Sequence, residues 1–366
     1  MVKVLGYDDV KNLIVGATIL GTGGGGEPKE GLKILTKDLD SGRELKIVKA
    51  SELDSESLVI CAYFCGSIPP PGKKEAQPEF DQRHITKAFN VMERRLGKKI
   101  SAVIPTEIGA ENTAVALHLA AKLGVPAMDG DQVGRSAPEL NQSSYVIFQV
   151  KATPSVITDP HGNIVVVEDY VNISNYESIV RSLAIASGGS VLVMDSPIKA
   201  EKAGKVAINN SVSRAIELGK VIEEARKHNK NPIEAAIKFV KGFKVFTGFI
   251  TSYSLKVEYG FLMGEIEIKG SGEWKGHSFR IWVKNENIIG WRDGRVAVMP
   301  PDLICMIDDN GYGITNSQVR IGMKVNIIGV KAHEIWRTPQ GIELFGPRHF
   351  GFDYDYVPIE KLLNEI

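Results

Sequence analysis

A run of four consecutive glycines, Gly23 to Gly26, is the first feature of the chain that points to chemistry. Ordering a glycine costs more conformational entropy than ordering any other residue, so a folded run indicates positive φ angles or a very close backbone approach. The N–H groups of this stretch could form a nest for an anionic or carbonyl-bearing group, backed by the dipole of the helix that begins near Pro28. A flexible connector between two helices is the structural alternative. The stretch lacks the Gly-Lys-Ser/Thr ending of a Walker loop and the preceding strand of a dinucleotide fingerprint.

A second dense stretch carries Asp129, Asp131, Arg135 and Glu139 within 11 residues. Carboxylates this concentrated pair with a cation, hold a metal, or include one whose raised pKa suits a general base. We treat the three carboxylates, Asp129, Asp131 and Glu139, as candidate catalytic residues. A purely structural clamp between an aspartate and Arg135 is the alternative. A metal held by Asp129, Asp131, Glu139 and a histidine such as His349 would activate water in a different way.

Three more polar residues follow predicted strands. Glu75 ends a Pro-rich loop after the apolar run 58–64, and Glu107 and Asn112 lie between a strand over 100–104 and an Ala/Leu-rich helix over 114–123. Ligands of open α/β sheets bind at the carboxyl ends of the strands. We therefore expect Glu75, Glu107 and Asn112 near one sheet edge, where Glu75 and Glu107 are candidate catalytic residues.

The elements that must position these residues form an α/β pattern over residues 1–168. Apolar periodicity of 3.6 predicts helices, short apolar runs predict buried strands of a parallel sheet, and a Pro-His-Gly-Asn turn predicts a closing β-hairpin. The predicted helices cover 10–20, 28–35, 80–95 and 114–123, and the predicted strands cover 45–48, 58–64, 100–104, 145–151, 155–158 and 164–168.

The second part, residues 169–366, begins with an α/β layer over 169–241 and continues as a β-rich part over 242–366. From Phe243 on, short strands recur about every ten residues between turn signals, which is typical of a barrel or a sandwich. Asn285-Glu286-Asn287 stands between two of these strands, and we favour a plain turn there over a polar group delivered to a cleft. The fold class predicted is α/β plus β, in more than one domain.

Composition narrows the class of protein. The 366 residues include 44 Lys+Arg and 44 Asp+Glu, so a formal net charge of zero and the lack of a basic block predict no nucleic-acid partner. A hydrophobic fraction of 43% with 24% charged residues is that of a soluble globular protein. Acidic residues near the N-terminus and the lack of a long apolar run predict no signal peptide and no membrane span, hence a cytoplasmic location.

The three cysteines do not form a disulfide framework, because their number is odd. Cys61 and Cys65 lie four residues apart on one face of a predicted strand. We interpret them as small buried apolar residues rather than as a metal or redox pair, because no second Cys/His pair at a recognisable spacing accompanies them.

Together these motifs resemble the S-methyl-thiohydantoin desulfurase family, long a family of unknown function and often encoded beside hydantoinase/oxoprolinase genes. The matching pieces run through nearly the whole chain in one order: 20–28, Gly66 with the Pro-rich loop and Glu75, 106–109 with Asn112, 129–140, 285–287, 301–304, and 344–348 with 350–351. Gly109-Ala110 stands where the family usually has two glycines, and Cys65 where small residues are common. The resemblance implies an N-terminal α/β domain with a parallel sheet and a β-rich C-terminal region.

The activity that the resemblance implies is hydrolysis at a C=N or C–S carbon of a small five-membered cyclic amide, such as an S-methyl thiohydantoin, with a thiol leaving and a hydantoin formed. Water must be deprotonated as it attacks, and charge that develops on a ring nitrogen must be stabilised. We expect Asp129 or Asp131 as general base, Glu107 or Glu75 at the ring nitrogen, and Arg135 against a substrate carboxylate.

The predicted substrate-binding set is completed by Thr22, Gly23, Gly24, Gly25 and Gly26, whose amides would bind the ring carbonyl or a substrate carboxylate, and by Asn112. No organic cofactor is predicted, and a divalent metal stays open. Expected partners are a small-molecule substrate, a second copy of the chain and hydantoinase/oxoprolinase subunits. Two other classes stay open: a non-catalytic accessory or ligand-binding subunit of such a system, and a nucleotide-dependent enzyme that uses the glycine run for phosphate.

Overall fold

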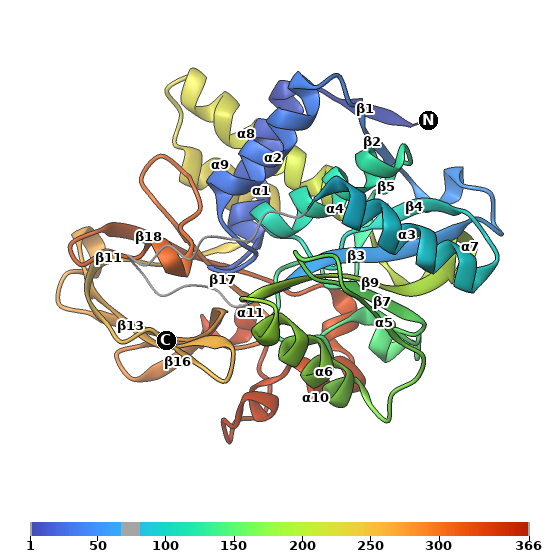
Figure 1. Ribbon diagram of the computed structural model, residues 1–366. Helices are drawn as coiled ribbons and strands as arrows, with labels where there is room; N and C mark the ends of the chain where they lie inside the picture. The colour runs from blue at the N-terminus through green and yellow to red at the C-terminus, as the bar shows by residue number, and fades with distance from the viewer. Residues whose placement is uncertain (1, 67–80, 365–366) are drawn as a thin grey trace.

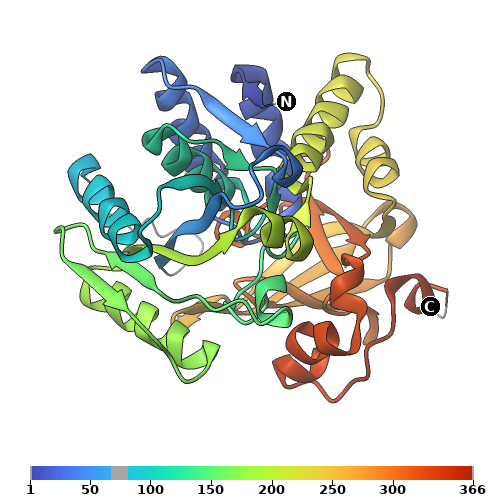
Figure 2. The ribbon, with the colours of Figure 1, turned by 90° about the vertical axis from the view of Figure 1, so that its right-hand side faces the viewer.

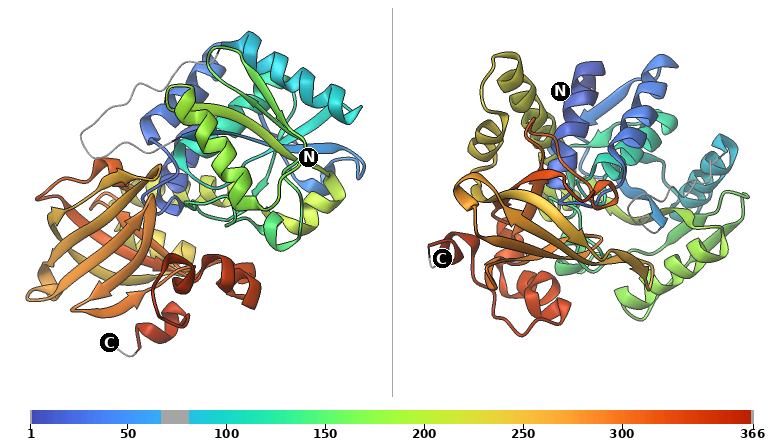
Figure 3. Two further views of the ribbon diagram at one scale, coloured as in Figure 1. Left: turned by 60° about the horizontal axis from the view of Figure 1, so that its bottom comes forward. Right: turned by 90° about the vertical axis from the view of Figure 1, so that its left-hand side faces the viewer.

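The computed structural model describes residues 2–66 and 81–364. In this part of the chain an N-terminal α/β domain with a mixed eight-stranded sheet lies beside a C-terminal domain built on a curled antiparallel sheet, which forms a half-barrel (Figure 1; Figure 3, left). The predicted class of α/β plus β is confirmed. One detail is wrong: the N-terminal sheet is not all parallel, because antiparallel strands flank its parallel centre.

The strands of the N-terminal sheet run in the order β1-β2-β5-β4-β3-β9-β7-β8, and β2, β5, β4 and β3 are parallel to one another. Their bounds are β1 (Lys3–Leu5), β2 (Leu45–Val48), β3 (Leu58–Gly66), β4 (Ile100–Ile104), β5 (Ala127–Met128), β7 (Ser155–Thr158), β8 (Ile164–Val167) and β9 (Ser190–Lys199). The helices of this domain are α1 (Tyr7–Leu20), α2 (Pro28–Asp40), α3 (Gln82–Leu96), α4 (Ala110–Leu123), α5 (Ser144–Ile147), α6 (Ile173–Ala186) and α7 (Ala200–Val206).

Strand β3 shows why the sheet is buried on both faces. Successive side chains of a strand point to opposite faces, so Ile60 and Ala62 pack in a core with α3 and α4, whereas Cys61 and Tyr63 pack in a second core with α6 and α7. The sheet is therefore covered by helices on both sides. Cys61 and Cys65 are buried free cysteines in the second core, as expected.

The predicted strand over 145–151 is wrong, because the chain forms the short helix α5 there. The side-chain oxygen of Ser143 accepts a hydrogen bond from Tyr145 N and caps the first turn of this helix. A four-residue helix is too short to show a 3.6-residue period, so its apolar residues imitate a strand. The hairpin that follows is confirmed, since β7 and β8 pair antiparallel and extend the sheet beyond β9.

Two long helices connect the domains. Helices α8 (Ser211–Lys227) and α9 (Pro232–Val240) lie in the segment 169–241, where the sequence predicts an α/β layer, and α8 lies along α1 (Figure 1). The two helices approach closely because α1 has a glycine at the contact: a Cβ atom on Gly16 would lie 1.9 Å from the carbonyl oxygen of Ala215. Just before α8, strand β10 (Ile208–Asn209) pairs with β6 (Gly130–Asp131), which fixes the acidic stretch against the start of this helix.

The C-terminal sheet has the order β16-β15-β14-β13-β11-β18-β17, and β12 pairs with β13. The bounds are β11 (Phe243–Tyr253), β12 (Lys256–Glu258), β13 (Phe261–Gly270), β14 (Ser278–Lys284), β15 (Glu286–Arg292), β16 (Arg295–Val298), β17 (Leu303–Ile307) and β18 (Lys324–Val330). The remaining helices are α10 (Pro339–Phe345), α11 (Ile359–Leu362) and the 3-10 turns Ala50–Glu52, Gly272–Trp274, Asn316–Gln318, Glu334–Arg337 and Pro347–Phe350.

Strand β17 joins the two domains. Its side chains alternate, so Cys305 and Ile307 enter the core shared with α1 and α8, whereas Ile304 and Met306 enter the core of the half-barrel. The C-terminal segment covers the outside of the half-barrel, where the Phe352 ring lies 5.1 Å from that of Trp282, centroid to centroid (Figure 2). None of the helices within the described residues is long and apolar enough to cross a membrane.

Candidate active site at the interface of the two domains

The glycine run forms a tight loop between α1 and α2. Gly23, Gly25 and Gly26 have φ angles of 93°, 76° and 82°, which strain any residue with a Cβ atom. Gly24 has no positive φ, but a Cβ atom there would lie 1.9 Å from Oε1 of Glu286. Conformation therefore requires glycine at three positions, and a side chain of the other domain requires it at the fourth.

Hydrogen bonds tie this loop to both domains. The carbonyl oxygens of Thr22 and Gly23 accept from the backbone N–H groups of Asn287 and Asn316, both at 2.7 Å, and these two residues belong to the C-terminal domain. The carbonyl oxygen of Gly25 accepts from two N–H groups in the first turn of α4. The loop is a junction between the domains and not a flexible connector.

The predicted nest has a mixed outcome. Within residues 2–66 and 81–364, no hydrogen bond engages the N–H groups of Gly23, Gly25 and Gly26, so these donors are available to a ligand. The first turn of α2 differs, because Glu27 N donates to Oε2 of Glu111 at 2.9 Å. A protein carboxylate thus lies at the helix end where a phosphate would bind, which disfavours the nucleotide-dependent alternative.

Glu107 is buried beside this loop, on the connection between β4 and α4. Its Oε1 accepts from Nδ2 of Asn112 at 2.5 Å, and its Oε2 accepts from the backbone N–H of Ala137 at 2.8 Å. Burial outweighs these hydrogen bonds and raises the pKa of Glu107 to about 7. Glu107 and Asn112 are thus brought together as predicted, and Asn112 orients the carboxyl group.

Glu286 is a functional candidate that the sequence analysis missed. It begins β15 and is buried, with its carboxyl group against Gly24. Burial raises its pKa well above the usual value, and the negative charge of Glu107 raises it further. Its Oε2 has no hydrogen-bond partner among the described residues. The feature of the sequence that could have identified Glu286 is its position between Asn285 and Asn287, at the start of an otherwise apolar strand.

Asp131 is the acidic residue of the second stretch that best fits a general base. Its Oδ2 accepts from the backbone N–H groups of Val133 and Gly134 at 2.8 and 2.6 Å, whereas its Oδ1 has no partner among the described residues. Burial raises the pKa of Asp131 to about 7, and the charge of Glu107 contributes to the rise. The backbone N–H of Gln132 donates to the Thr106 carbonyl at 3.0 Å, which joins the loop of Asp131 to that of Glu107.

Asp129 and Glu139 lie in separate networks. Asp129 accepts from the backbone N–H and the hydroxyl of Ser213, at 2.9 and 2.6 Å, and so holds the start of α8. Glu139 contacts Lys284 and accepts from Nε2 of His349 at 2.6 Å. Burial favours the neutral form of Glu139, but these two cationic partners outweigh it and hold its pKa at about 2. The low pKa of Glu139 does not suit a base near neutral pH, and both oxygens of Asp129 are occupied by Ser213.

A metal at Asp129, Asp131, Glu139 and His349 is not favoured by this geometry. The first three carboxylates occupy three different hydrogen-bond networks, and only Glu139 contacts the histidine. Within the part of the chain that the structure describes, no group of three or more His, Cys, Asp or Glu side chains could hold a metal ion. The binding of a divalent metal stays open, without a ligand set among the described residues. The candidate catalytic residue Glu75 lies outside the described residues.

Arg135 uses every donor of its guanidinium group within the protein. Nε donates to Ser136 O, Nη1 to the carbonyls of Pro301 and Asp302, and Nη2 to Thr22 Oγ1 and Asn287 O, at 2.8 to 3.4 Å. The guanidinium carbon also lies 5.1 Å from the ring centroid of Phe345. No donor is left for a substrate carboxylate, so we interpret Arg135 as a clamp between the domains, and Thr22 as part of it.

Asp195 extends the polar interior behind Asp131. Its Oδ2 accepts from the hydroxyl groups of Tyr63 and Tyr176 at 2.8 and 2.9 Å, and its Oδ1 has no partner among the described residues. Burial raises the pKa of Asp195 to about 6. The charges of Asp195 and Asp131 both act on the buried Cys61 thiol, whose pKa burial raises well above the usual value. The feature of the sequence that could have identified Asp195 is the presence of an aspartate inside the apolar run of β9.

Comparisons with known proteins agree with the fold and identify the family. The solved structure of a protein from Chromobacterium violaceum superposes with a TM-score of 0.80, at 18% identity, over 98% of this chain and 100% of that one. No curated protein matches the sequence. The model of the S-Me-THD-like N-terminal domain matches residues 8–169, and that of the S-Me-THD-like C-terminal domain matches residues 171–359. The chain therefore belongs to the S-Me-THD-like family, the S-methyl-thiohydantoin desulfurase family that its motifs indicate.

Proposed function

We propose that this protein hydrolyses a small cyclic amide or thioimidate of the S-methyl thiohydantoin type, with release of a thiol and formation of a hydantoin. The family supports a thiohydantoin-related role. The observation that carries the hydrolytic step is the pair of buried carboxyl groups, Glu107 and Asp131, each with a pKa of about 7. At neutral pH such a pair can contain one proton donor and one proton acceptor.

In the proposed reaction, a water molecule attacks the ring carbon that bears sulfur. Oδ1 of Asp131 takes a proton from this water, because its other oxygen already accepts two backbone hydrogen bonds. Glu107 donates a proton or a hydrogen bond to the adjacent ring nitrogen, on which charge develops. The C–S bond then breaks as the carbonyl forms, and the proton of the added hydroxyl passes to the thiolate to give the thiol. Transfer of the proton from Asp131 to Glu107 restores both groups. A thiol leaves readily because its pKa is low.

The glycine loop would hold the ring. The N–H groups of Gly23, Gly25 and Gly26 are free of protein partners within the described residues and suit a ring carbonyl oxygen or a substrate carboxylate. Glu286 lies against Gly24, and burial raises its pKa and favours its protonated form, which would donate a hydrogen bond to the ring. Self-association, partnership with hydantoinase/oxoprolinase subunits and a cytoplasmic location remain part of this proposal.

The test is the release of methanethiol from an S-methyl thiohydantoin by the purified protein, measured with a thiol reagent. Because general acid–base groups contribute about 10²–10⁴-fold, we expect E107Q and D131N each to lower kcat by at least about 100-fold. The matched control is E177Q, which alters a buried carboxylate on α6 whose two oxygens bond to Arg181 and Leu140 N. E177Q should stay within about threefold of the wild type.

One result would refute the hydrolase, and a second would refute the roles of Glu107 and Asp131 in it. If the wild type binds S-methyl thiohydantoins tightly but releases no thiol from any of them, the protein is a ligand-binding subunit. If E107Q and D131N turn over the substrate like the wild type, these carboxyl groups are structural. Circular dichroism spectra of each variant establish that a lost activity is not a lost fold.

A further inference from the structure

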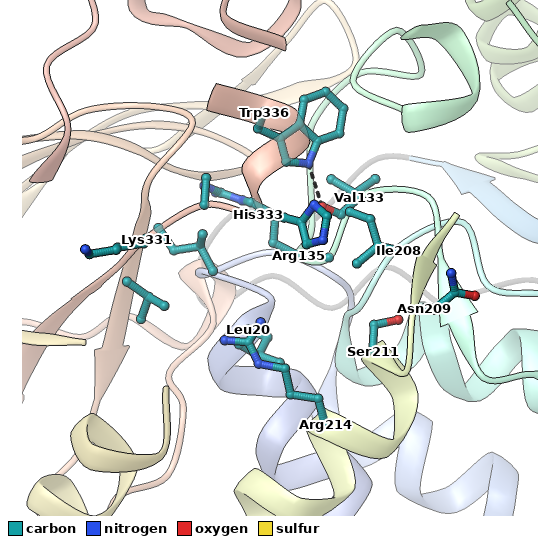
Figure 4. A pocket seen from close by; sticks show the side chains of 14 residues that line it. Leu20, Val133, Arg135, Ile208, Asn209, Ser211, Arg214, Lys331, His333 and Trp336 are labelled. Carbon is teal, nitrogen blue, oxygen red and sulfur yellow. Dashed lines mark hydrogen bonds between the residues drawn. The ribbon is translucent and has the colours of Figure 1, made fainter. Parts of the chain in front are cut away.

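A second potential binding site lies where the start of α8 meets the C-terminal domain. A cavity of about 80 Å³ opens there between the loop Val133–Arg135, the first residues of α8 and the segment Val330–Trp336 (Figure 4). Pockets for drug-sized ligands measure about 300–1,000 Å³. This cavity therefore has room only for a small group, either free or at the end of a larger molecule.

The walls of the cavity offer hydrogen-bond donors. Ser211 is 4% exposed, and its Oγ has no hydrogen-bond partner among the described residues. Nδ1 of His333 accepts from Ile335 N at 3.4 Å, which places the proton of the neutral ring on Nε2 and makes Nε2 a donor. The carbonyl oxygen of Val133 is already occupied, since it accepts from Nε1 of Trp336 at 2.7 Å.

Arg214 supplies the charge. It stands one turn into α8, is exposed, and its guanidinium group has no hydrogen bond or ion pair with any described residue. Figure 4 shows this side chain reaching toward Leu20 at the cavity, whereas Lys331 extends away from it. Lys331 pairs with Glu360, and Arg135 is held by the clamp. Among the described residues of this cavity wall, Arg214 is therefore the cation that is free for a ligand.

Asp131 lies close to Ser211, and its negative charge only partly offsets the positive potential that Arg214 creates at the cavity. The hydroxyl of Ser211 is close enough to favour the charged form of this carboxyl group, but the two do not meet hydrogen-bond geometry. Burial raises the pKa of Asp131 to about 7, so a large fraction of it is neutral at neutral pH. A buried unpaired hydroxyl, an imidazole donor and an unpaired guanidinium group then face one small space.

We propose that this cavity binds a small oxyanion, a carboxylate or phosphate group, through Arg214, Ser211 and His333. The bound group would contact α8 and the C-terminal domain at once and would stabilise their contact. A free inorganic ion and the carboxylate of an organic molecule share this chemistry. The inference does not depend on the proposed hydrolysis.

The experiment is a calorimetric and thermal-shift titration of the full chain with inorganic phosphate and with acetate, at an ionic strength held constant with KCl. We expect at least one anion to bind and to raise the unfolding temperature. A hydrogen bond to a charged group is worth about 1.5–3 kcal/mol, so R214Q should weaken binding at least about tenfold, and S211A by a smaller factor. The control K220Q removes an exposed positive charge from the same helix and should change the affinity less than twofold.

Tighter binding of phosphate would indicate a free ion or phosphoryl group, and tighter binding of acetate would indicate a carboxylate ligand; either supports the site. Two results would overturn it: no stabilisation of the wild type by either anion beyond that of KCl, or equal weakening by K220Q and R214Q. Because the guanidinium group of Arg214 has no partner among the described residues, R214Q should unfold at the wild-type temperature when no anion is added. The readout is binding, so it remains decisive even if no thiol is released.

Discussion

Replacement of Arg135 by glutamine tests whether this side chain clamps the domains or binds substrate. The guanidinium group is 1% exposed, is bonded to three carbonyl oxygens of the C-terminal domain and one hydroxyl of the glycine loop, and stacks on Phe345. In R135Q most of these acceptors lose their donor while they remain buried. An unsatisfied buried acceptor costs about 1–3 kcal/mol, and removal of one partner from a buried charged network costs about 3–5 kcal/mol in total.

A loss of this size is a large part of the stability of a typical protein, about 5–15 kcal/mol. With a urea m-value of about 3 kcal/mol/M, it lowers the unfolding midpoint by about 1–1.7 M. Urea unfolding followed by circular dichroism and by tryptophan fluorescence measures this shift. The four tryptophans all lie in the C-terminal domain, and Trp336 donates to Val133 O across the interface. Fluorescence therefore reports the separation of the domains.

The matched control is R214Q, which removes an arginine from the same interdomain cavity but breaks no protein hydrogen bond. Its midpoint should stay within about 0.2 M of the wild type, since surface substitutions usually change stability by less than about 0.5 kcal/mol. A wild-type midpoint in R135Q, combined with a raised KM for a carboxylate-bearing substrate, would refute the clamp and restore the original assignment of Arg135 to substrate binding.

Three further predictions follow from the same geometry. G25A should be far more destabilising than G42A, measured by urea unfolding: both glycines have φ of 76°, but a Cβ atom on Gly25 would meet backbone at 2.5 Å whereas one on Gly42 meets nothing. Burial raises the pKa of Asp131 from 3.8 to about 7 and so favours its protonated form in the folded protein. As pH rises from about 4 to 7, the free energy of unfolding of the wild type should therefore fall by about 4 kcal/mol relative to that of D131N. For Glu139 the pH dependence of stability is opposite, because its pKa is lowered. Its ionised form stabilises the wild type relative to E139Q at pH 7, and this difference should vanish as pH falls from about 4.5 to 2.

The sequence predicted most of the fold because its strands are buried on both faces and appear as apolar runs. The run 58–64 became β3, and the segment 100–104 became β4 with the same bounds. The direction of β9 could not be predicted, because a buried strand has the same apolar composition whether its neighbours are parallel or antiparallel. Strand direction depends on how distant segments connect, and local periodicity contains no such information.

The position of a candidate residue can be predicted where it follows a strand of the N-terminal sheet. Glu107 follows β4 and Asp131 follows β5, which are neighbours in this sheet, so topology alone places both near the same region. Glu286 was missed because it reaches the loop from the other domain, more than 250 residues along the chain from Gly24. From the sequence, Arg135 is expected to bind a substrate carboxylate, because arginine commonly pairs with carboxylates. Its acceptors in the structure are mostly backbone carbonyls, and the type of the residues that carry them does not reveal this contact.

The arrangement around Gly24 makes the protonation of buried carboxyl groups depend on the relative position of the two domains. Gly23, Gly25 and Gly26 have positive φ and N–H groups without a partner among the described residues, and the carboxyl group of Glu286 lies against Gly24 between them. Glu107 comes from the N-terminal domain and Glu286 from the C-terminal domain, and the charge of one raises the pKa of the other. A small rotation between the domains would separate these acids, admit water and return both pKa values toward the ordinary range. In the proposed reaction the Arg135 clamp would therefore act without touching the substrate, because it holds together the two domains whose contact buries Glu286 near Glu107 and raises the pKa of Glu286.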